Sequence, residues 1–179
     1  MDNKDIKKLN IEHPGLIYQD NIIKLEIIEK IISLFNKDKQ NKDNIINENC
    51  LVFWNGIKHH HDIDLYLYNT LQEYLQIYLN YYNQIKENII DSGYLLINHD
   101  DNYISHWETP NNADDNINIC VIIYALDNLE IEFKYINKKI NMDKGSMIIF
   151  PSNFTYTYKI NDFNNGSIII SIISYSKKP

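Results

Sequence analysis

The hydrophobic periodicity of the chain changes after Gly93, and this change limits the possible folds more than any other feature. Before Gly93, apolar residues recur at three- and four-residue steps over 21–35 and 62–84, which predicts two amphipathic helices. After Gly93, six β-rich runs are separated by turns: 94–99, 117–126, 130–136, 146–150, 154–160 and 167–176. This order predicts a mainly β (α+β) fold whose N-terminal helices pack on one sheet of a sandwich or barrel.

Shorter segments complete this interpretation. Residues 15–19 and 51–54 are strand-like, and the polar stretch 36–49 is predicted to be a loop. Asp20 or Asn21 is expected to cap the first helix. The run FTYTYKI at 154–160 alternates strictly, so it predicts one face formed by alternate residues of a strand. The residues of that predicted face are Phe154, Tyr156, Tyr158 and Ile160.

Size and charge narrow the class of protein. The 179 residues (21.3 kDa) fit one domain, 1–179, with no repeat and no long linker. A net charge of -7 argues against nucleic acid or an anionic membrane as partner, because both attract basic proteins. The N-terminus does not resemble a signal peptide, and the longest apolar runs are far shorter than the ~20 residues that span a bilayer. These observations predict an intracellular protein without a membrane segment.

Residue usage is biased towards Ile, Asn, Tyr and Lys, and none of the 17 basic residues is Arg. Such a bias is typical of an AT-rich coding sequence, which suggests a virus, a phage or an AT-rich microbe. The only cysteines are Cys50 and Cys120. Cys120 lies in an apolar run and is predicted to be a small buried hydrophobe rather than half of a disulfide.

Two polar clusters are interpreted as solvated loops. The first is His59-His60-His61-Asp62. Adjacent residues point in different directions and seldom bind one metal, so this cluster is expected to precede the long helix, with Asp62 as its N-cap. The second comprises Asp100-Asp101 and Asp114-Asp115, which could at most bind a cation weakly.

The sequence His106-Trp107-Glu108 is the stronger candidate for chemistry. Alternation along a strand places His106 and Glu108 on the same side, with Trp107 on the other. An imidazole and a carboxylate in this arrangement are a plausible pair of neighbouring ligands for Fe(II).

Several segments around this motif resemble the prolyl-4-hydroxylase-like branch of the iron- and 2-oxoglutarate-dependent dioxygenases, in the small form found in phages and viruses. LIYQDNIIKLEIIEKIISLF resembles the opening strand and helix, and YYNQIKENIIDSGYLLINHDDNYISHWE the segment that leads to the iron-binding H-x-D. DKGSMIIFPSNFTYTYKI resembles the strand and F-P-S-N-F stretch before the distal histidine, and ISIISY the closing strand. The resemblance implies that 94–176 form a double-stranded β-helix, the jelly roll of cupin-like proteins.

The chain departs from the family's pattern at the positions that would hold cofactors. Glu108 stands where the family has Asp, Tyr158 stands where the distal histidine belongs, and no histidine follows His106. The cation that grips the far carboxylate of 2-oxoglutarate should fall near Ile168 or Ile169, where the chain has only Ser and Ile. Burying that carboxylate without a cation is costly.

The sequence therefore predicts a dioxygenase-fold protein without 2-oxoglutarate turnover, which needs no cofactor and acts as a binding or structural module. Its expected partner is a protein or a virion component, in the cytoplasm of a host cell or in the virion. The alternative is an active Fe(II)/2-oxoglutarate-dependent hydroxylase of a peptide or small molecule. Its metal ligands would be His106, Glu108 and Tyr158, and its cosubstrate would be held by Lys134 or Lys159.

Overall fold

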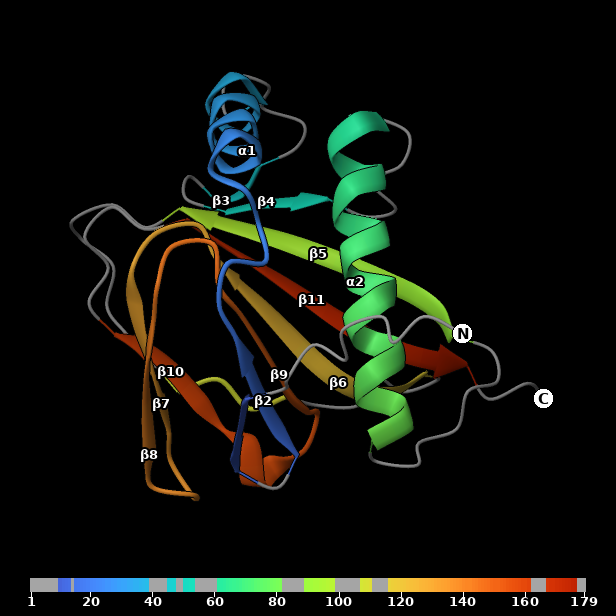
Figure 1. The fold of residues 1–179 in the computed structure, drawn as a ribbon, viewed down its shortest axis with the longest axis vertical. Coiled ribbons are helices and arrows are strands. Elements are labelled where there is room, and N and C mark those ends of the chain that lie inside the picture. The colour runs from blue at the N-terminus through green and yellow to red at the C-terminus, as the bar shows by residue number, and fades with distance from the viewer. Residues whose placement is uncertain are drawn as a thin grey trace, which may run out of the picture.

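The computed structural model describes residues 10–13, 15–38, 45–47, 50–53, 61–81, 89–98, 107–110, 116–161 and 167–176. Within these ranges the chain forms two α-helices, a short 3-10 helix and strands that all pair antiparallel (Figure 1). The elements are β1 (Asn10–His13), β2 (Leu16–Gln19), α1 (Leu25–Asp38), β3 (Ile45–Asn47), β4 (Cys50–Phe53), α2 (His61–Tyr81), β5 (Ile89–Asn98), β6 (Asn116–Ala125), β7 (Leu129–Phe133), β8 (Lys138–Met142), β9 (Met147–Pro151), η3 (Phe154–Tyr156), β10 (Tyr158–Asn161) and β11 (Ser167–Ser176).

The strands form one large and one small sheet. The large sheet has the order β1-β2-β9-β6-β11-β5-β4-β3, and the small sheet has the order β10-β7-β8. Glu108 adds an isolated antiparallel bridge to Tyr158 at the β10 side of the small sheet. The prediction of a mainly β fold with antiparallel sheets and few helices is confirmed.

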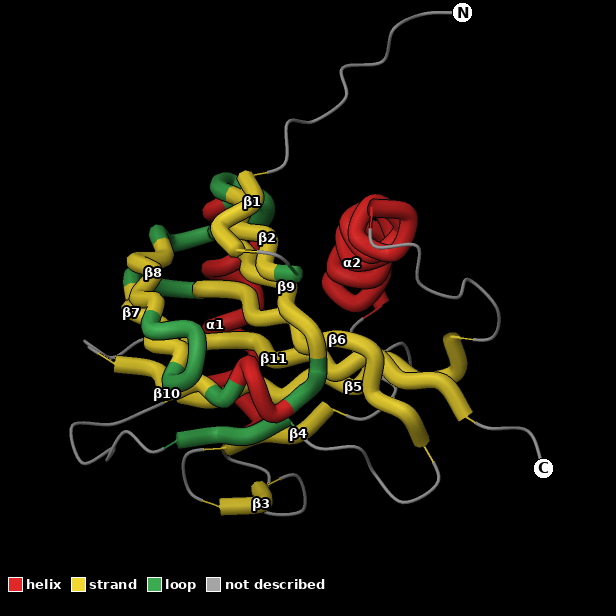
Figure 2. The backbone as a smooth tube through the Cα atoms, turned by 90° about the horizontal axis from the view of Figure 1, so that it is seen from below, coloured by secondary structure: helices red, strands yellow, loops and turns green. Residues whose placement is uncertain are grey.

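The large sheet is buried on both faces at β6, and alternation along this strand explains how. Along β6, Cys120, Ile122 and Tyr124 belong to a core cluster that contains side chains of α1 and α2. The intervening Val121 and Ile123 belong to a second cluster, which contains side chains of the small sheet. Figure 2 shows β7, β8 and β10 grouped on the left, with α2 well apart from them at the upper right. Strands that are buried on both faces have continuous apolar sequences, as this chain does at β6 and β9.

The first helix begins later than predicted, at Leu25 rather than at Asn21. Ile22 and Ile23 are buried, and both backbone N–H groups donate to the carbonyl oxygen of Gly145, at 2.7 and 3.0 Å. This contact to the β8–β9 turn holds the two residues outside the helix, so capping by Asp20 or Asn21 was a wrong prediction. Helix α2 lies close to its predicted range. No helix in the described ranges is long and apolar enough to cross a membrane.

Three short strands escaped prediction: β1, β3 and β8. Strand β3 lies within the stretch 36–49, which was wrongly predicted to be entirely loop. In β8 only Ile140 and Met142 are buried, because Lys138, Lys139 and Asn141 face outwards. Strands this short and polar have a weak hydrophobic periodicity. They are strands because they form hydrogen bonds with a neighbouring strand.

The strand predicted over 154–160 begins only at Tyr158, and Phe154 is 62% exposed instead of facing inwards. Asn153 causes the difference. Its side-chain oxygen accepts the N–H of Thr155 at 3.0 Å and its carbonyl accepts the N–H of Tyr156 at 3.1 Å, which closes the 3-10 turn η3. The turn rotates Phe154 outwards while Tyr156 and Tyr158 remain buried.

Replacing Gly145 by Ala should destabilise the fold. Gly145 has a φ of +85°, and a Cβ built there would lie 2.7 Å from the carbonyl oxygen of Ile23. Because both the backbone conformation and the close approach exclude a side chain, Gly145→Ala should cost about 1–3 kcal/mol in the free energy of unfolding measured with urea. The control is Lys144→Ala in the same turn, since the side chain of Lys144 is exposed. Equal urea midpoints for the two variants would contradict this account.

Candidate functional site

Residues 107–110 attach to the start of β10, and this junction places Glu108 beside Tyr158. The N–H of Glu108 donates to the carbonyl of Tyr158 at 2.7 Å, and the N–H of Tyr158 donates back to Glu108 at 2.9 Å. The hydroxyl oxygens of Thr109 and Thr157 are 3.1 Å apart and share a hydrogen bond. The side chains of directly opposed residues in antiparallel strands extend to the same side. The side chains of Glu108 and Tyr158 therefore point to the same side of this strand pair.

The ring of Tyr158 lies in an aromatic cluster between the two sheets. It contacts Phe150 edge-on at a centroid distance of 5.3 Å, and Phe150 contacts Phe133 in the same way at 5.1 Å. Tyr156 packs against both phenylalanines at 6.1 and 6.2 Å. All four residues are buried, and they belong to the core cluster shared by the two sheets. Aromatic side chains therefore fill the interior next to the Glu108–Tyr158 pair.

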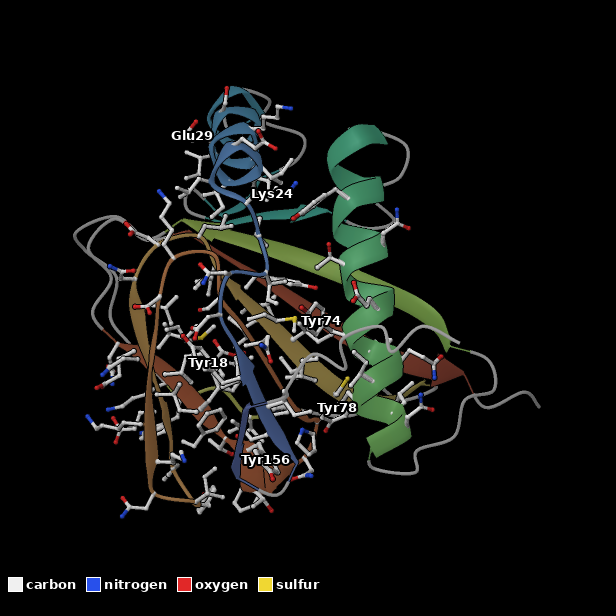
Figure 3. All side chains as sticks on the ribbon, in the orientation of Figure 1. Tyr18, Lys24, Glu29, Tyr74, Tyr78 and Tyr156 are labelled. Carbon is white, nitrogen blue, oxygen red and sulfur yellow. The ribbon has the colours of Figure 1, made fainter. Side chains whose placement is uncertain are left out.

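Tyrosines from distant parts of the chain also meet around β2. In Figure 3, Tyr74 and Tyr78 point from α2 towards the sheet, and Tyr156 lies near the end of β2. The hydroxyl of Tyr78 donates to the carbonyl of Gly15 at 3.2 Å, and a Cβ on Gly15 would lie 2.8 Å from the hydroxyl of Tyr156. The apolar side of α2 thus packs against the large sheet.

The predicted metal ligands are described only in part. Glu108 is exposed and Tyr158 is buried, whereas His106 lies outside the described residues. Among the residues that the structure describes, no group of three or more His, Cys, Asp or Glu side chains could hold a metal ion. The structure thus brings Glu108 and Tyr158 together and leaves the position of the imidazole untested.

The lysines proposed for the cosubstrate lie on the outer face of the small sheet. Lys134 follows the buried Phe133 and is exposed. Lys159 follows the buried Tyr158, and its ammonium group lies 2.9 Å from the carboxylate of Glu132. The hydrogen bond from Lys159 lowers the pKa of Glu132 and so favours its ionised carboxylate.

Strand β11 presents apolar side chains where the family's cation is expected. Ile168 is fully buried, Ile170 is 9% exposed, and both belong to the cluster between the two sheets. These two are the side chains of β11 whose burial the structure describes. The aliphatic surface that they offer has no charge to pair with a carboxylate.

The remaining candidates have separate outcomes. Cys120 is fully buried and free, as predicted, and burial raises the pKa of its thiol, which makes it unreactive. His59, His60 and the acidic pairs at 100–101 and 114–115 lie outside the described residues. His61 and Asp62 form the first turn of α2, so the predicted capping role of Asp62 is replaced by a position inside the helix.

Sequence reasoning missed an exposed group of aromatic and lysine side chains on the outer face of the small sheet. Its members are Trp107, Lys134, Tyr135, Phe154 and Lys159. One signal was available: the alternation that pairs His106 with Glu108 sends Trp107 to the other side. The exposure of Phe154 depends on the η3 turn. The strictly alternating sequence of 154–160 predicts a strand there and gives no sign of this turn.

No protein-family model matches the sequence, and no curated protein matches it. Solved structures do match, at 13% sequence identity or below for the three that follow. A viral collagen prolyl hydroxylase from Paramecium bursaria Chlorella virus-1 aligns over 92% of this chain and 90% of its own, with a TM-score of 0.65. A Pseudomonas putida prolyl-4-hydroxylase is 10% identical and aligns over 92% and 94%, with a TM-score of 0.63.

A Trichoplax adhaerens prolyl hydroxylase, solved with a peptide fragment of a hypoxia-inducible factor, is 12% identical and also has a TM-score of 0.63, over 90% of this chain and 84% of its own. These alignments span nearly the whole chain and most of each neighbour. The chain therefore has the fold of the prolyl-4-hydroxylase-like iron- and 2-oxoglutarate-dependent oxygenases.

Proposed function

We propose that this chain is a dioxygenase-fold protein without 2-oxoglutarate turnover, which serves as a binding or structural module for a protein partner in a host cell or in a virion. The two sheets form the two layers of a double-stranded β-helix, and α1 and α2 cover the outer face of the large layer. The aromatic and aliphatic filling between the layers is the observation that carries the proposal.

An Fe(II) and 2-oxoglutarate site does not fit the described residues. The cosubstrate's far carboxylate needs a buried cation, yet the described side chains of β11 that face the interior are Ile168 and Ile170. The two candidate lysines lie on the opposite side of the small sheet. At the distal ligand position, Tyr158 offers a phenol, which is a poorer ligand for Fe(II) than the imidazole of a histidine.

The aromatic cluster explains what replaces the cofactors. Edge-on contacts among Phe133, Phe150 and Tyr158 are each worth about 0.5–1.5 kcal/mol beyond the burial of their apolar surface. The interior thus contributes to stability in the absence of metal and cosubstrate. A module of this kind needs only its surface to function.

The active hydroxylase is the second candidate. Its support is the fold, because the neighbours named above are hydroxylases and one related structure of the viral enzyme is a complex with 2-oxoglutarate. It requires His106 beside Glu108, and it also requires a cation from a part of the chain other than the described face of β11.

Thermal unfolding distinguishes the two candidates. The melting temperature of the wild-type protein should not change when Mn(II) and 2-oxoglutarate are added. Under the proposal, the protein lacks the side chains that would bind either ligand. A ligand at 100 times its dissociation constant would add about 2.7 kcal/mol of stability, which is readily measured. The viral collagen prolyl hydroxylase is the positive control. Succinate release that depends on Fe(II) in the wild-type protein would overturn the proposal.

Replacing Tyr158 by His should raise the affinity for metal and leave turnover absent. The substitution supplies an imidazole at the distal ligand position, while the cation for 2-oxoglutarate is still missing. We expect Tyr158→His to bind Mn(II) more tightly than the wild-type protein in a calorimetric titration. The loss of aromatic packing should lower stability by about 1–3 kcal/mol.

Tyr158→Phe is the matched control for this experiment. It removes the hydroxyl, keeps the ring that packs on Phe150 and adds no ligand, so its Mn(II) affinity should remain at the wild-type level. If Tyr158→His and Tyr158→Phe bind Mn(II) equally, the alignment of Tyr158 with the distal ligand is wrong.

A further inference from the structure

A continuous row of aromatic rings and ammonium groups lies on the outer face of the small sheet. It runs through Phe154, Tyr135, Lys134, Trp107 and Lys159, and we refer to these residues as the aromatic–lysine row. The rings of Phe154 and Tyr135 lie 4.3 Å apart between centroids. The ammonium group of Lys134 is 5.4 Å from the Tyr135 ring and 5.7 Å from the Trp107 ring, and that of Lys159 is 4.9 Å from the Trp107 ring.

Backbone hydrogen bonds fix the segments that carry this row. The N–H of Lys134 donates to the carbonyl of Thr157 at 2.9 Å, which extends the ladder between β7 and β10. On the other side of β10, the double hydrogen bond of Glu108 and the hydroxyl contact of Thr109 anchor Trp107. The row is therefore held in place before any partner arrives, and a preorganised surface loses little entropy on binding.

The row combines exposed apolar surface with the exposed ammonium group of Lys134. Phe154 is 62% exposed, Tyr135 48% and Trp107 38%, and contiguous exposed apolar surface is a feature of sites that contact a partner. Lys159 is paired with Glu132 at 2.9 Å. No carboxylate of the described residues forms an ion pair with Lys134, whose ammonium group lies against the two aromatic faces.

We infer that the aromatic–lysine row is the docking surface for an acidic peptide segment of a protein partner. One partner carboxylate pairs with Lys134, and neighbouring apolar side chains cover the rings of Tyr135 and Phe154. The inference rests on the proposed function, because it supplies the surface through which a module without turnover would act.

The surrounding charges favour a peptide over a polyanion. Glu130 and Glu132 lie on the same outer face, where Lys139 pairs with both of them at 3.1 and 3.5 Å. Because these carboxylates are neutralised by Lys139 and Lys159, they leave Lys134 as a cation available to a partner, while the net charge of -7 repels the continuous phosphates of nucleic acid or of an anionic membrane. The ammonium group of Lys134, set between rings, suits an isolated carboxylate flanked by apolar groups.

A displayed library of short random peptides tests the inference. The full chain is immobilised, and peptides are selected on the wild-type protein and, in parallel, on Lys134→Glu. We expect the wild-type protein to enrich peptides that place Asp or Glu next to an aromatic or aliphatic residue, and Lys134→Glu to lose them. Enriched peptides without acidic residues, equal enrichment on both proteins, or no enrichment at all would each overturn the inference.

The most enriched peptide is then synthesised with a fluorophore, and its affinity is measured by anisotropy. Lys134→Ala should weaken binding by about threefold to fivefold, as expected for one exposed ion pair, and Phe154→Ser by about fivefold or more, because it removes an aromatic anchor. Lys144→Ala removes an exposed lysine outside the row and should leave the affinity unchanged. Melting temperatures equal to that of the wild-type protein show that each variant is folded.

Sedimentation of the wild-type protein distinguishes a peptide partner from a second copy of this chain. The protein alone should sediment as a monomer, whereas self-association that Lys134→Glu abolishes would make a second copy the occupant and overturn the inference. Failure here leaves the thermal-shift result with 2-oxoglutarate unaffected. Conversely, succinate release would reject the proposed function without changing the peptide measurements.

Discussion

The insertion of β11 between β5 and β6 is the contact on which the rest of the structure depends. Nine residue pairs join β11 to each neighbour, and the strand links β1-β2-β9-β6 to β5-β4-β3 within one large sheet. Ile168 and Ile170 project from this strand into the interior. These two buried apolar residues are therefore part of the element that unites the sheet, which couples the apolar character of the interior directly to stability.

The small sheet separates two surfaces with opposite properties. Its inner face carries Phe133 and Tyr158 in a packed aromatic cluster, whereas its outer face carries Lys134 and Lys159 beside exposed rings. Period-two alternation produces both faces from the same few residues. A one-residue change of register in β10 would bury Lys159 and expose Tyr158, so the core and the surface are specified together.

Long elements with strong periodicity could be predicted from the sequence, because their apolar pattern reports burial directly. Strand β11 matches its predicted range, and α2 and β6 differ from theirs only at the ends. Strand β8 could not be predicted, since its neighbours rather than its own composition make it a strand. The outward turn of Phe154 was also hidden, because it depends on one capping side chain, that of Asn153.

The candidate site was predictable where backbone pairing decides the geometry: the motif resemblance placed Glu108 near Tyr158, and two hydrogen bonds join them. The association of Trp107 with Lys134 could not be derived from the sequence, because it requires the register between β7 and β10 and the attachment of residues 107–110.

The contact between Gly145 and the start of α1 has a consequence for synthesis on the ribosome. The two hydrogen bonds from Ile22 and Ile23 to Gly145 span more than 120 residues, and β2 pairs with β9 over a similar separation. Loops of this length close slowly, so the first strand and helix cannot reach their places until most of the chain has left the ribosome. Meanwhile, the apolar face of α1 lacks the side chains of β6 and β9 that it packs with in the folded protein, so this face stays exposed until those strands have been synthesised.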